Sequence, residues 1–258
     1  MATDARPGNL GEYGLQDRVA VVTGGSGGIG AATVRRLAAG GATCVVGYNS
    51  GEDRARALVA ALPGGGHLAL RMPMEDSDAL RAAAAEVEAR LGRCDVLVNS
   101  AATTRAVPHA DLEALDDALI DRVLVANVRG PFATIRAFAP MLRRGGDGVI
   151  VNVSSLAAVT GTGSSIIYGA SKAALDTMGM SLARVLAPEV RVVSVSPSAV
   201  ATDFVPGRSR EAVERQAATS PLKRVTEADD VALAILGAIT HLRFTTGTAI
   251  LVDGGKHL

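Results

Sequence analysis

RVAVVTGGSGGIG, residues 18–30, is the stretch that decides the fold. It joins a nearly continuous apolar run to a turn made almost entirely of glycine. An apolar run without polar alternation is typical of a parallel strand that is covered on both faces. Small residues after such a strand let the backbone approach an anion closely, and the following helix directs its first N–H groups at it. The stretch therefore predicts a strand, a turn and a helix that bind the pyrophosphate of a dinucleotide.

The same alternation of short apolar runs and Ala/Leu/Arg-rich segments continues to the end of the chain. Helices between parallel strands require right-handed crossovers, which build a doubly wound sheet. No repeat or linker divides the chain, so we expect one α/β domain over residues 16–258, after a mobile lead-in over residues 1–15. The predicted architecture is a Rossmann-type, seven-stranded parallel sheet with helices on both faces. The predicted strands are 18–23, 43–48, 67–71, 94–99, 149–154, 190–196 and 248–252.

Helix signals lie between these runs. Residues 30–39 stop at two glycines, and an alanine-rich segment after Ser77 runs to Leu91 and stops at Gly92. Glycine directly after a helical segment is a common stop signal. Two longer helices are predicted at about 111–127 and 165–187.

Composition excludes several classes of protein. The 258 residues carry 26 basic and 26 acidic side chains, so the net charge is zero and nothing draws the chain toward nucleic acid or an anionic membrane. No segment resembles a secretory signal or a membrane span. The two cysteines form no disulfide framework, and the four histidines lack metal-ligand spacing. We expect a cytoplasmic protein without a metal site, without nucleic acid and without membrane contact.

Tyr168 and Lys172 are four residues apart, which places both side chains on one face of a helix. A free tyrosine has a pKa of about 10, too high for acid–base work near neutrality. A neighbouring cation favours the phenolate and lowers that pKa. The pair therefore predicts an acid–base tyrosine that exchanges a proton with a carbonyl or alcohol oxygen.

Residues 149–155, VIVNVSS, form an apolar strand that ends in two serines. A serine hydroxyl at that position either binds a substrate oxygen or caps the next segment. These residues alone leave both interpretations open.

Together these residues resemble the short-chain dehydrogenase/reductase family, in its short single-domain branch, over about residues 16–255. The resemblance is closest to 3-oxoacyl-carrier-protein reductases. The four-residue spacing of Tyr168 and Lys172, with Ser155 upstream, distinguishes it from the enoyl-reductase branch. The family marks in chain order are Thr23–Gly30, Asn99-Ser100-Ala101-Ala102, Asn127, Ser155, Tyr168 with Lys172, Pro197–Thr202 and Val252-Asp253-Gly254-Gly255.

Two glycine spacings fit the turn, one with Gly28 and one with Gly27 between Gly24 and Gly30. The resemblance selects Gly28, because larger relatives with the other spacing add a C-terminal substrate domain for which this chain has no residues left.

The resemblance implies a catalytic tetrad of Asn127, Ser155, Tyr168 and Lys172. Tyr168 would be the acid–base and Ser155 would hold the reacting oxygen. Lys172 would lower the tyrosine pKa and bind the nicotinamide ribose, and Asn127 would position a relay water behind it. Tyr168 and Lys172 would also contact the cofactor. The other implied cofactor residues are Gly24, Ser26, Gly28, Ile29, Gly30, Tyr48, Asn49, Ser50, Asn99, Ala101, Pro197, Val200 and Thr202.

Three positions depart from the family pattern. Ala102 and Ser198 replace glycines near the expected cofactor. Pro73 stands where relatives commonly have an aspartate beside adenine, so an adenine contact there would use backbone or Met74.

Cofactor preference depends on the end of the second strand. Relatives that prefer NAD commonly have an acidic residue there, which binds the adenosine 2′-hydroxyl. This chain has Tyr48, followed by Asn49 and Ser50, and Arg54 lies one helical turn later. NADP(H) is therefore favoured over NAD(H).

Substrate choice belongs to a lid over about residues 203–226. Phe204 and Val205 indicate an apolar wall there, although packing of the lid helix would explain them equally well. We expect hydride transfer between the nicotinamide and a small carbonyl or secondary alcohol, as in a 3-oxoacyl or related carbonyl reductase. A carrier-protein-bound substrate is one form considered, with Arg143-Arg144 as a contact, although the two arginines would equally well bind the carbonyls of an exposed helix end. The alternatives are an alcohol, sugar or steroid dehydrogenase, or a catalytically silent nucleotide-binding sensor or scaffold.

The family resemblance also implies a homotetramer. The two long helices carry more apolar residues than one sheet-facing stripe requires, although packing on their own sheet would also explain them. These residues are Leu115, Leu119, Val123 and Ala126 in the first helix, and Ala170, Ala173, Ala174, Leu175, Met178, Leu182 and Leu186 in the second.

Overall fold

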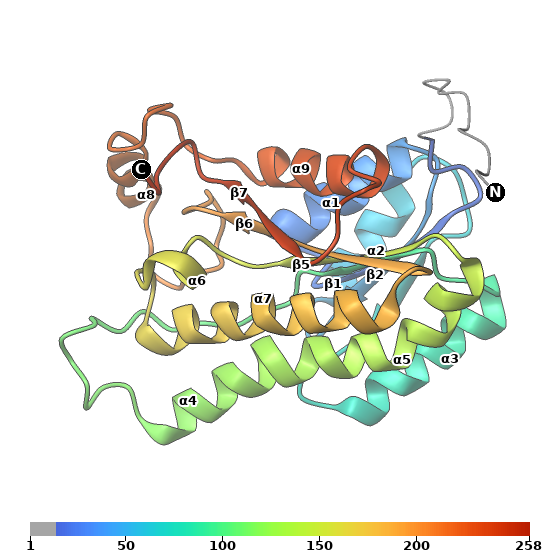
Figure 1. Cartoon of the computed structure of the whole chain (residues 1–258), viewed down its shortest axis with the longest axis horizontal. Coiled ribbons are helices and arrows are strands. Elements are labelled where there is room, and N and C mark those ends of the chain that lie inside the picture. The colour runs from blue at the N-terminus through green and yellow to red at the C-terminus, as the bar shows by residue number, and fades with distance from the viewer. Residues whose placement is uncertain (1–13) are drawn as a thin grey trace.

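A seven-stranded parallel sheet forms the centre of the molecule (Figure 1). The computed structural model describes residues 14–258. The strand order is β3-β2-β1-β4-β5-β6-β7, and every neighbouring pair is parallel. The predicted doubly wound sheet is therefore confirmed. The strands are β1 Val19–Thr23, β2 Thr43–Tyr48, β3 Leu68–Arg71, β4 Val96–Asn99, β5 Gly148–Val153, β6 Val190–Pro197 and β7 Thr248–Val252.

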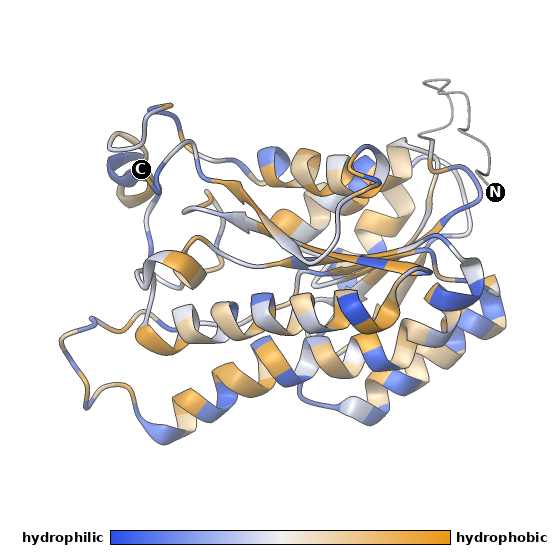
Figure 2. Ribbon diagram, in the orientation of Figure 1, coloured by the Kyte–Doolittle hydropathy of each residue, from blue (hydrophilic) through white to orange (hydrophobic). Residues whose placement is uncertain are grey.

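Helices cover both faces of this sheet. Helices α1 (Gly28–Ala39), α2 (Glu52–Ala61) and α9 (Ala228–Thr240) pack on one face. Helices α3 (Ser77–Leu91), α5 (Gly130–Gly145) and α7 (Ile166–Leu186) pack on the other. Figure 2 shows apolar residues along the strands and mixed apolar and polar residues along the helices. This pattern follows from burying one stripe of each helix and both faces of each strand.

Alternate residues of a strand enter the two cores. In β1, Val19 and Val21 lie in the α3/α5/α7 core, whereas Ala20 and Val22 lie in the α1/α2/α9 core. Because neighbouring side chains of a strand point to opposite faces, an apolar run without alternation is what this sheet requires.

The helix predicted at 111–127 differs from the structure at both ends. Helix α4 (Asp117–Leu124) starts later, because Asp116 is its N-cap and accepts a hydrogen bond from the N–H of Leu119 at 2.7 Å. It does not stop at Asn127, since a π-helical turn, Val125–Arg129, carries it directly into α5. Helix α7 matches its prediction, with Ser165 as its N-cap.

Four of the apolar residues predicted for subunit contacts face the protein's own interior. Leu119, Val123, Leu175 and Leu186 are buried in the core, so packing on their own chain explains these four. The remaining seven residues of that set are partly or fully exposed. Other apolar side chains of α4, α5 and α7 are exposed, namely Leu124, Phe132, Ile166, Met180 and Val185.

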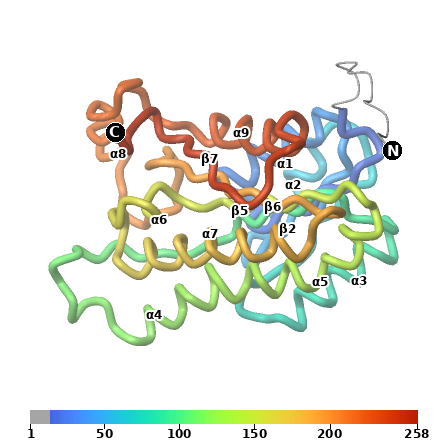
Figure 3. Tube along the Cα trace, in the orientation of Figure 1, coloured from blue at the N-terminus to red at the C-terminus, as the bar shows by residue number. Residues whose placement is uncertain are grey.

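The segment after β6 crosses the carboxyl end of the sheet. It contains α8 (Arg210–Ala217) and lies beside the C-terminal residues (Figure 3), where Lys256 Nζ donates to the Gln216 carbonyl at 3.1 Å. The short helix α6 (Ala157–Thr160) lies at the same end of the molecule.

The predicted lead-in over residues 1–15 falls almost wholly outside the described residues. Its last residue, Leu15, is buried, and its N–H donates to the Gly40 carbonyl at 2.9 Å. Over residues 14–258, no helix is both long and apolar enough to span a membrane.

Candidate active site

A cleft of about 1720 Å³ opens at the carboxyl ends of the strands. Its walls come from the glycine turn after β1, the residues after β2, β4, β5 and β6, and the start of α7. This is the expected position for a ligand in an open α/β sheet, because the strand order changes direction between β1 and β4.

The glycine turn forms one end of the cleft and requires glycine at defined positions. Gly24 has φ +63°, and a Cβ there would lie 2.9 Å from the Ala101 Cα. A Cβ on Gly30 would lie 2.2 Å from the Gly24 carbonyl oxygen. Gly28 also has a positive φ of +48°, whereas Gly27 has extended backbone and open space around it. The structure thus agrees with the Gly24, Gly28, Gly30 spacing on steric grounds.

A dinucleotide fits this turn. Backbone without side chains faces the cleft at Gly24 and Gly28, ahead of a 12-residue helix whose first N–H groups have no side-chain cap. Thr23 Oγ1 accepts hydrogen bonds from the N–H groups of Ser100 and Ala101 at 3.1 Å, which ties the turn to the end of β4. The predicted cofactor residues that line the cleft are Gly24, Ser26, Gly28, Ile29, Asn49, Ala101, Tyr168, Lys172, Pro197, Val200 and Thr202.

Tyr48 does not line the cleft, in contrast to the prediction. Its ring is buried in the α1/α2/α9 core, and its hydroxyl lies beside Glu52, where burial and then the Glu52 charge raise the pKa of the phenol. Ser50 is exposed and also lies outside the cleft wall. Asn49 and Arg54 are the residues of this region that border the cleft.

Gly30 and Asn99 likewise lie behind the cleft wall. Gly30 permits close packing of the turn, as described above. Asn99 is buried at the end of β4, and its Nδ2 donates to Asn152 Oδ1 at 2.9 Å. Met72 and Met74 border the cleft on either side of Pro73. An adenine contact through backbone or Met74 stays a prediction.

Asn127 is fully buried within the π-helical turn and does not reach the cleft. Its Oδ1 accepts from the Thr103 N–H at 2.8 Å, and its Nδ2 donates to the Thr103 carbonyl at 3.0 Å and to Ser171 Oγ at 3.1 Å. In this structure Asn127 joins the segment after β4 to helix α7. It thereby positions the helix that carries Tyr168 and Lys172.

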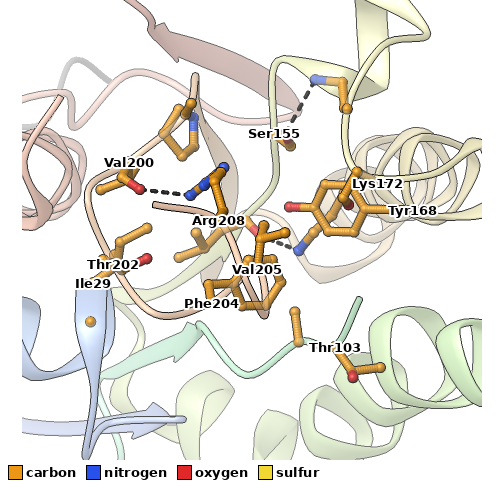
Figure 4. A pocket seen from close by; sticks show the side chains of 18 of the residues that line it. Ile29, Thr103, Ser155, Tyr168, Lys172, Val200, Thr202, Phe204, Val205 and Arg208 are labelled. Atoms are coloured by element: carbon orange, nitrogen blue, oxygen red, sulfur yellow. Dashed lines mark hydrogen bonds between the residues drawn. The ribbon is translucent and has the colours of Figure 1, made fainter. Parts of the chain in front are cut away.

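Ser155, Tyr168 and Lys172 come together at the other end of the cleft (Figure 4). Tyr168 and Lys172 lie in the first two turns of α7, and Ser155 follows β5. Ser155 caps the following segment, since its Oγ accepts from the Ala157 N–H at 3.2 Å, and its side chain also hydrogen-bonds Tyr168. That its hydroxyl binds a substrate oxygen stays a prediction.

That Lys172 lowers the pKa of Tyr168 stays a prediction, because Ser155 and Arg208 are the groups that lower this pKa in the structure. Burial raises the pKa of Tyr168, and the Ser155 hydrogen bond and the Arg208 charge oppose that shift. Lys172 Nζ lies 5.8 Å from the Tyr168 ring centroid and donates to the Val153 carbonyl at 2.7 Å. Burial also lowers the pKa of Lys172 to about 8, against the opposing charge of Asp176.

The lid forms the outer wall of the cleft at the end where Ser155, Tyr168 and Lys172 lie. The Phe204 ring lies 5.8 Å from the Tyr168 ring, Val205 is buried, and Arg208 enters the cleft beside them (Figure 4). The apolar wall predicted from Phe204 and Val205 is therefore present. The position of Arg208 opposite Tyr168 was not predicted, because sequence spacing does not specify where a loop side chain points.

Buried polar groups continue behind Lys172. Asp176 lies one turn further along α7, and its hydrogen bonds to Ser194 and Ser154 partly offset the burial that raises the pKa of its carboxyl. Among residues 14–258, no group of three or more His, Cys, Asp or Glu side chains is placed to hold a metal ion.

Comparisons with known proteins identify relatives over nearly the whole chain. The ketoacyl reductase 2 named for the granaticin polyketide synthase of Streptomyces violaceoruber is 40% identical over 242 residues, covering 93% of this chain and 96% of the relative. A cis-4-hydroxycyclohexanecarboxylate dehydrogenase of Sinomonas cyclohexanicum is 37% identical over 245 residues, covering 93% and 96%. A 3-oxoacyl-[acyl-carrier-protein] reductase of Staphylococcus aureus is 32% identical over 244 residues, covering 93% and 98%.

A family model and a solved structure extend these similarities. The model described as enoyl-(acyl carrier protein) reductase matches residues 24–257. A short-chain dehydrogenase from Burkholderia cenocepacia, solved in complex with NADP, is 34% identical and superposes with a TM-score of 0.85, covering 95% of this chain and 99% of that one. The resemblance drawn from the sequence motifs is thus confirmed, and the chain belongs to the short-chain dehydrogenase/reductase family of NAD(P)-dependent oxidoreductases.

Proposed function

We propose that this chain is an NADPH-dependent reductase of a 3-oxoacyl or closely related carbonyl compound. The observation that carries the proposal is the meeting of Ser155, Tyr168 and Lys172 at one end of a cleft whose other end is the glycine turn. This arrangement places an acid–base group and a hydrogen-bond donor where a carbonyl would meet a bound nicotinamide.

The roles of the side chains follow from their contacts. The bound nicotinamide would supply or accept a hydride at the carbon of the substrate. Tyr168 would donate its phenolic proton to the carbonyl oxygen, and Ser155 would donate a second hydrogen bond to that oxygen. Lys172 would bind the ribose and return a proton to Tyr168. Asn127 would hold α7 in place.

NADP(H) remains the favoured cofactor. No carboxylate stands at the end of β2, because Tyr48 occupies that position and is buried. The Arg54 guanidinium borders the cleft and lies so close to Gly51 that a Cβ there would be 2.7 Å from Nη2. Glu75 also borders this end and accepts a 3.4 Å hydrogen bond from Asn49. Arg54 would therefore attract a 2′-phosphate, whereas Glu75 would repel it.

The opposite reaction direction is the second candidate. The Sinomonas relative is named as a dehydrogenase of a hydroxy acid, so oxidation of a secondary alcohol fits the same side chains equally well. The intact Ser155, Tyr168 and Lys172 favour an enzyme over a silent sensor. The four-residue Tyr168–Lys172 spacing favours carbonyl over enoyl reduction, whatever the description of the matching family model.

The proposal also includes a cytoplasmic location and a homotetramer. The tetramer is supported by the exposed apolar side chains of α4, α5 and α7, including Phe132 and Val185. A carrier-protein-bound substrate is supported by the open end of the cleft and by the exposed Arg143 and Arg144. Arg144 pairs with Glu88 at 2.7 Å, so its availability to a carrier protein depends on breaking that pair.

The experiment that tests the function is a panel of ketones, 3-oxoacyl thioesters and secondary alcohols, assayed with both cofactors by absorbance of the reduced nicotinamide. We expect turnover of 3-oxoacyl thioesters with NADPH, and a lower Kd for NADPH than for NADH. Binding of neither cofactor, or binding without turnover of any carbonyl or alcohol, would contradict the proposal.

A further inference from the structure

One cation of the lid lies inside the cleft without an acidic partner. Arg208 precedes α8, is half-buried, and borders the cleft beside Phe204 and Tyr168 (Figure 4). Its Nη2 donates to the Val200 carbonyl at 2.8 Å, which holds the guanidinium across the mouth of the cleft.

One N–H group of this guanidinium has no hydrogen-bond acceptor among residues 14–258. Arg208 Nε is buried and has no hydrogen-bond partner among the residues that the structure describes. Within the same residues, no carboxylate lies within ion-pair distance of it, whereas Arg210 pairs with Glu214 and Glu227. A buried cation with a free N–H is costly unless a ligand supplies the missing acceptor.

The surroundings of Arg208 increase the binding energy that such an acceptor would contribute. Phe204, Val205 and Val200 surround the guanidinium with apolar side chains on the lid side. The nearby Lys172 ammonium is bonded to the Val153 carbonyl rather than to a group in the cleft. In the proposed function Lys172 serves the ribose and Tyr168, so Arg208 remains as the cation for an anionic group of the substrate. An arginine stays protonated throughout the neutral range.

We propose that Arg208 binds a carboxylate of the substrate, so that among the carbonyl compounds related to 3-oxoacyl thioesters this enzyme favours oxo acids, or the corresponding hydroxy acids, whose free carboxylate is a few bonds from the reacting carbon. The inference rests on the proposed function, because a substrate whose reacting oxygen is bound to Tyr168 would bring its carboxylate to Arg208. A guanidinium presents N–H groups in a planar fork that matches the two oxygens of a carboxylate. Arg208 would be a specificity-determining residue rather than an acid–base.

The test compares oxo acids with their neutral esters. Acetoacetate and levulinate are assayed with NADPH beside methyl acetoacetate and methyl levulinate, which keep the ketone and remove the charge. We expect kcat/KM for each acid to exceed that for its ester by about 10- to 100-fold, as for a charged hydrogen bond in a buried site. Arg208→Gln should reduce this ratio to near one.

A matched control is available on α8. Arg215 is exposed and does not border the cleft, so Arg215→Gln removes the same charge from the lid without removing the contact. We expect Arg215→Gln to retain the acid-to-ester ratio of the unmodified enzyme. An equal loss of the ratio in both variants would assign the effect to the net charge of the lid and overturn the proposal.

Calorimetry provides a measurement that does not depend on turnover. Acetoacetate is titrated into the protein–NADP⁺ complex, and we expect Arg208→Gln to weaken its binding by about 10-fold or more. If Arg208→Gln instead raised the Kd of NADPH by that factor and left acetoacetate binding unchanged, Arg208 would serve the cofactor phosphates and the proposal would be wrong.

Failure of the two proposals can be distinguished. Turnover of the esters with an acid-to-ester ratio near one, and no difference in Arg208→Gln, would reject only the carboxylate contact. NADPH binding without turnover of any carbonyl or alcohol would reject the proposed function, while calorimetry would still decide whether Arg208 binds the carboxylate.

Discussion

Tyr168 combines a hydroxyl in the cleft with a ring that packs against Phe204. Tyr168→Phe keeps the ring and removes the proton donor. We expect kcat to fall by about 10²- to 10⁴-fold, the usual contribution of a positioned acid or base. The Kd of NADPH should change by no more than about threefold, because the ring remains in place.

Stopped-flow measurement of NADPH oxidation, with fluorescence titration of cofactor binding, checks this result. Retention of most of the turnover would show that another group donates the proton. A parallel loss of cofactor affinity would instead assign Tyr168 a mainly structural role.

Lys172 predicts a pH dependence of stability. Its pKa falls from 10.5 to about 8 in the folded protein, because its ammonium is buried. Between these values the unfolded chain binds a proton that the folded protein does not, so the free energy of unfolding rises with pH. The stability of the unmodified protein relative to Lys172→Met should therefore increase by about 2 kcal/mol from about pH 7 to pH 10.

Urea unfolding of both proteins across this range measures the difference. The difference cancels the contributions of titrating groups that do not interact with Lys172. The cost of leaving the Val153 carbonyl without a partner in Lys172→Met adds a constant to the difference, so the change of the difference with pH is the quantity to compare. A difference independent of pH would mean that Lys172 keeps its ordinary pKa when folded.

At the scale of the element, the turn between β1 and α1 contains two neighbouring glycines, of which one tolerates a side chain and the other does not. Gly27 has extended backbone and no atom within 4 Å of a built Cβ, whereas Gly28 has φ +48° and would bring a Cβ to 3.3 Å from Thr202 Cγ2. Gly28→Ala should lower the free energy of unfolding by about 1–2 kcal/mol, the cost of a left-handed non-glycine residue.

Gly28→Ala should also raise the Kd of NADPH, by about tenfold for each 1.4 kcal/mol of lost binding energy. Gly27→Ala is the matched control, and its stability and cofactor affinity should match those of the unmodified protein. Thermal unfolding and cofactor titration measure both properties. Equal effects of the two substitutions would mean that the turn tolerates neither side chain, and that Gly28 has no special role.

Helix α7 joins the site to the outer surface of the molecule. Its first two turns carry Tyr168 and Lys172, whereas Met180 and Val185 are exposed further along it. The continuous unit of α4, the π-helical turn and α5 packs beside α7, and Asn127 bonds the two together. Association on this surface would therefore also restrain the helix that holds the acid–base pair.

At the scale of the whole molecule, we expect a homotetramer with dihedral symmetry. Phe132→Glu should weaken assembly, because it places a charge on the exposed apolar surface of α5. Leu112→Glu is the control, since Leu112 is 68% exposed in the loop before α4. Sedimentation velocity at micromolar concentration distinguishes the states. A monomeric unmodified protein would reject the assembly, and identical behaviour of the two variants would reject this surface as its interface.

The sequence alone determined the layers, the sheet and the residue types of the site. Apolar strands covered on both faces admit few arrangements other than a doubly wound parallel sheet, so residues 19–23 and their counterparts specified the architecture locally. The pairing of Tyr168 with Lys172 also depends on a short spacing, namely four residues in a helix. The glycine turn fitted two spacings, and the positive φ of Gly28 distinguishes them in the structure.

Tertiary structure decided which of those residues reach the cleft. Tyr48 turned into the core because its ring gains more by burial against α1 and α2 than by facing water, and Asn127 became a bond between segments rather than a wall of the site. Arg208 entered the cleft because the Val200 carbonyl holds its guanidinium there. Such orientations depend on contacts between segments far apart in the chain, and these contacts exist only once the sheet has brought the segments together.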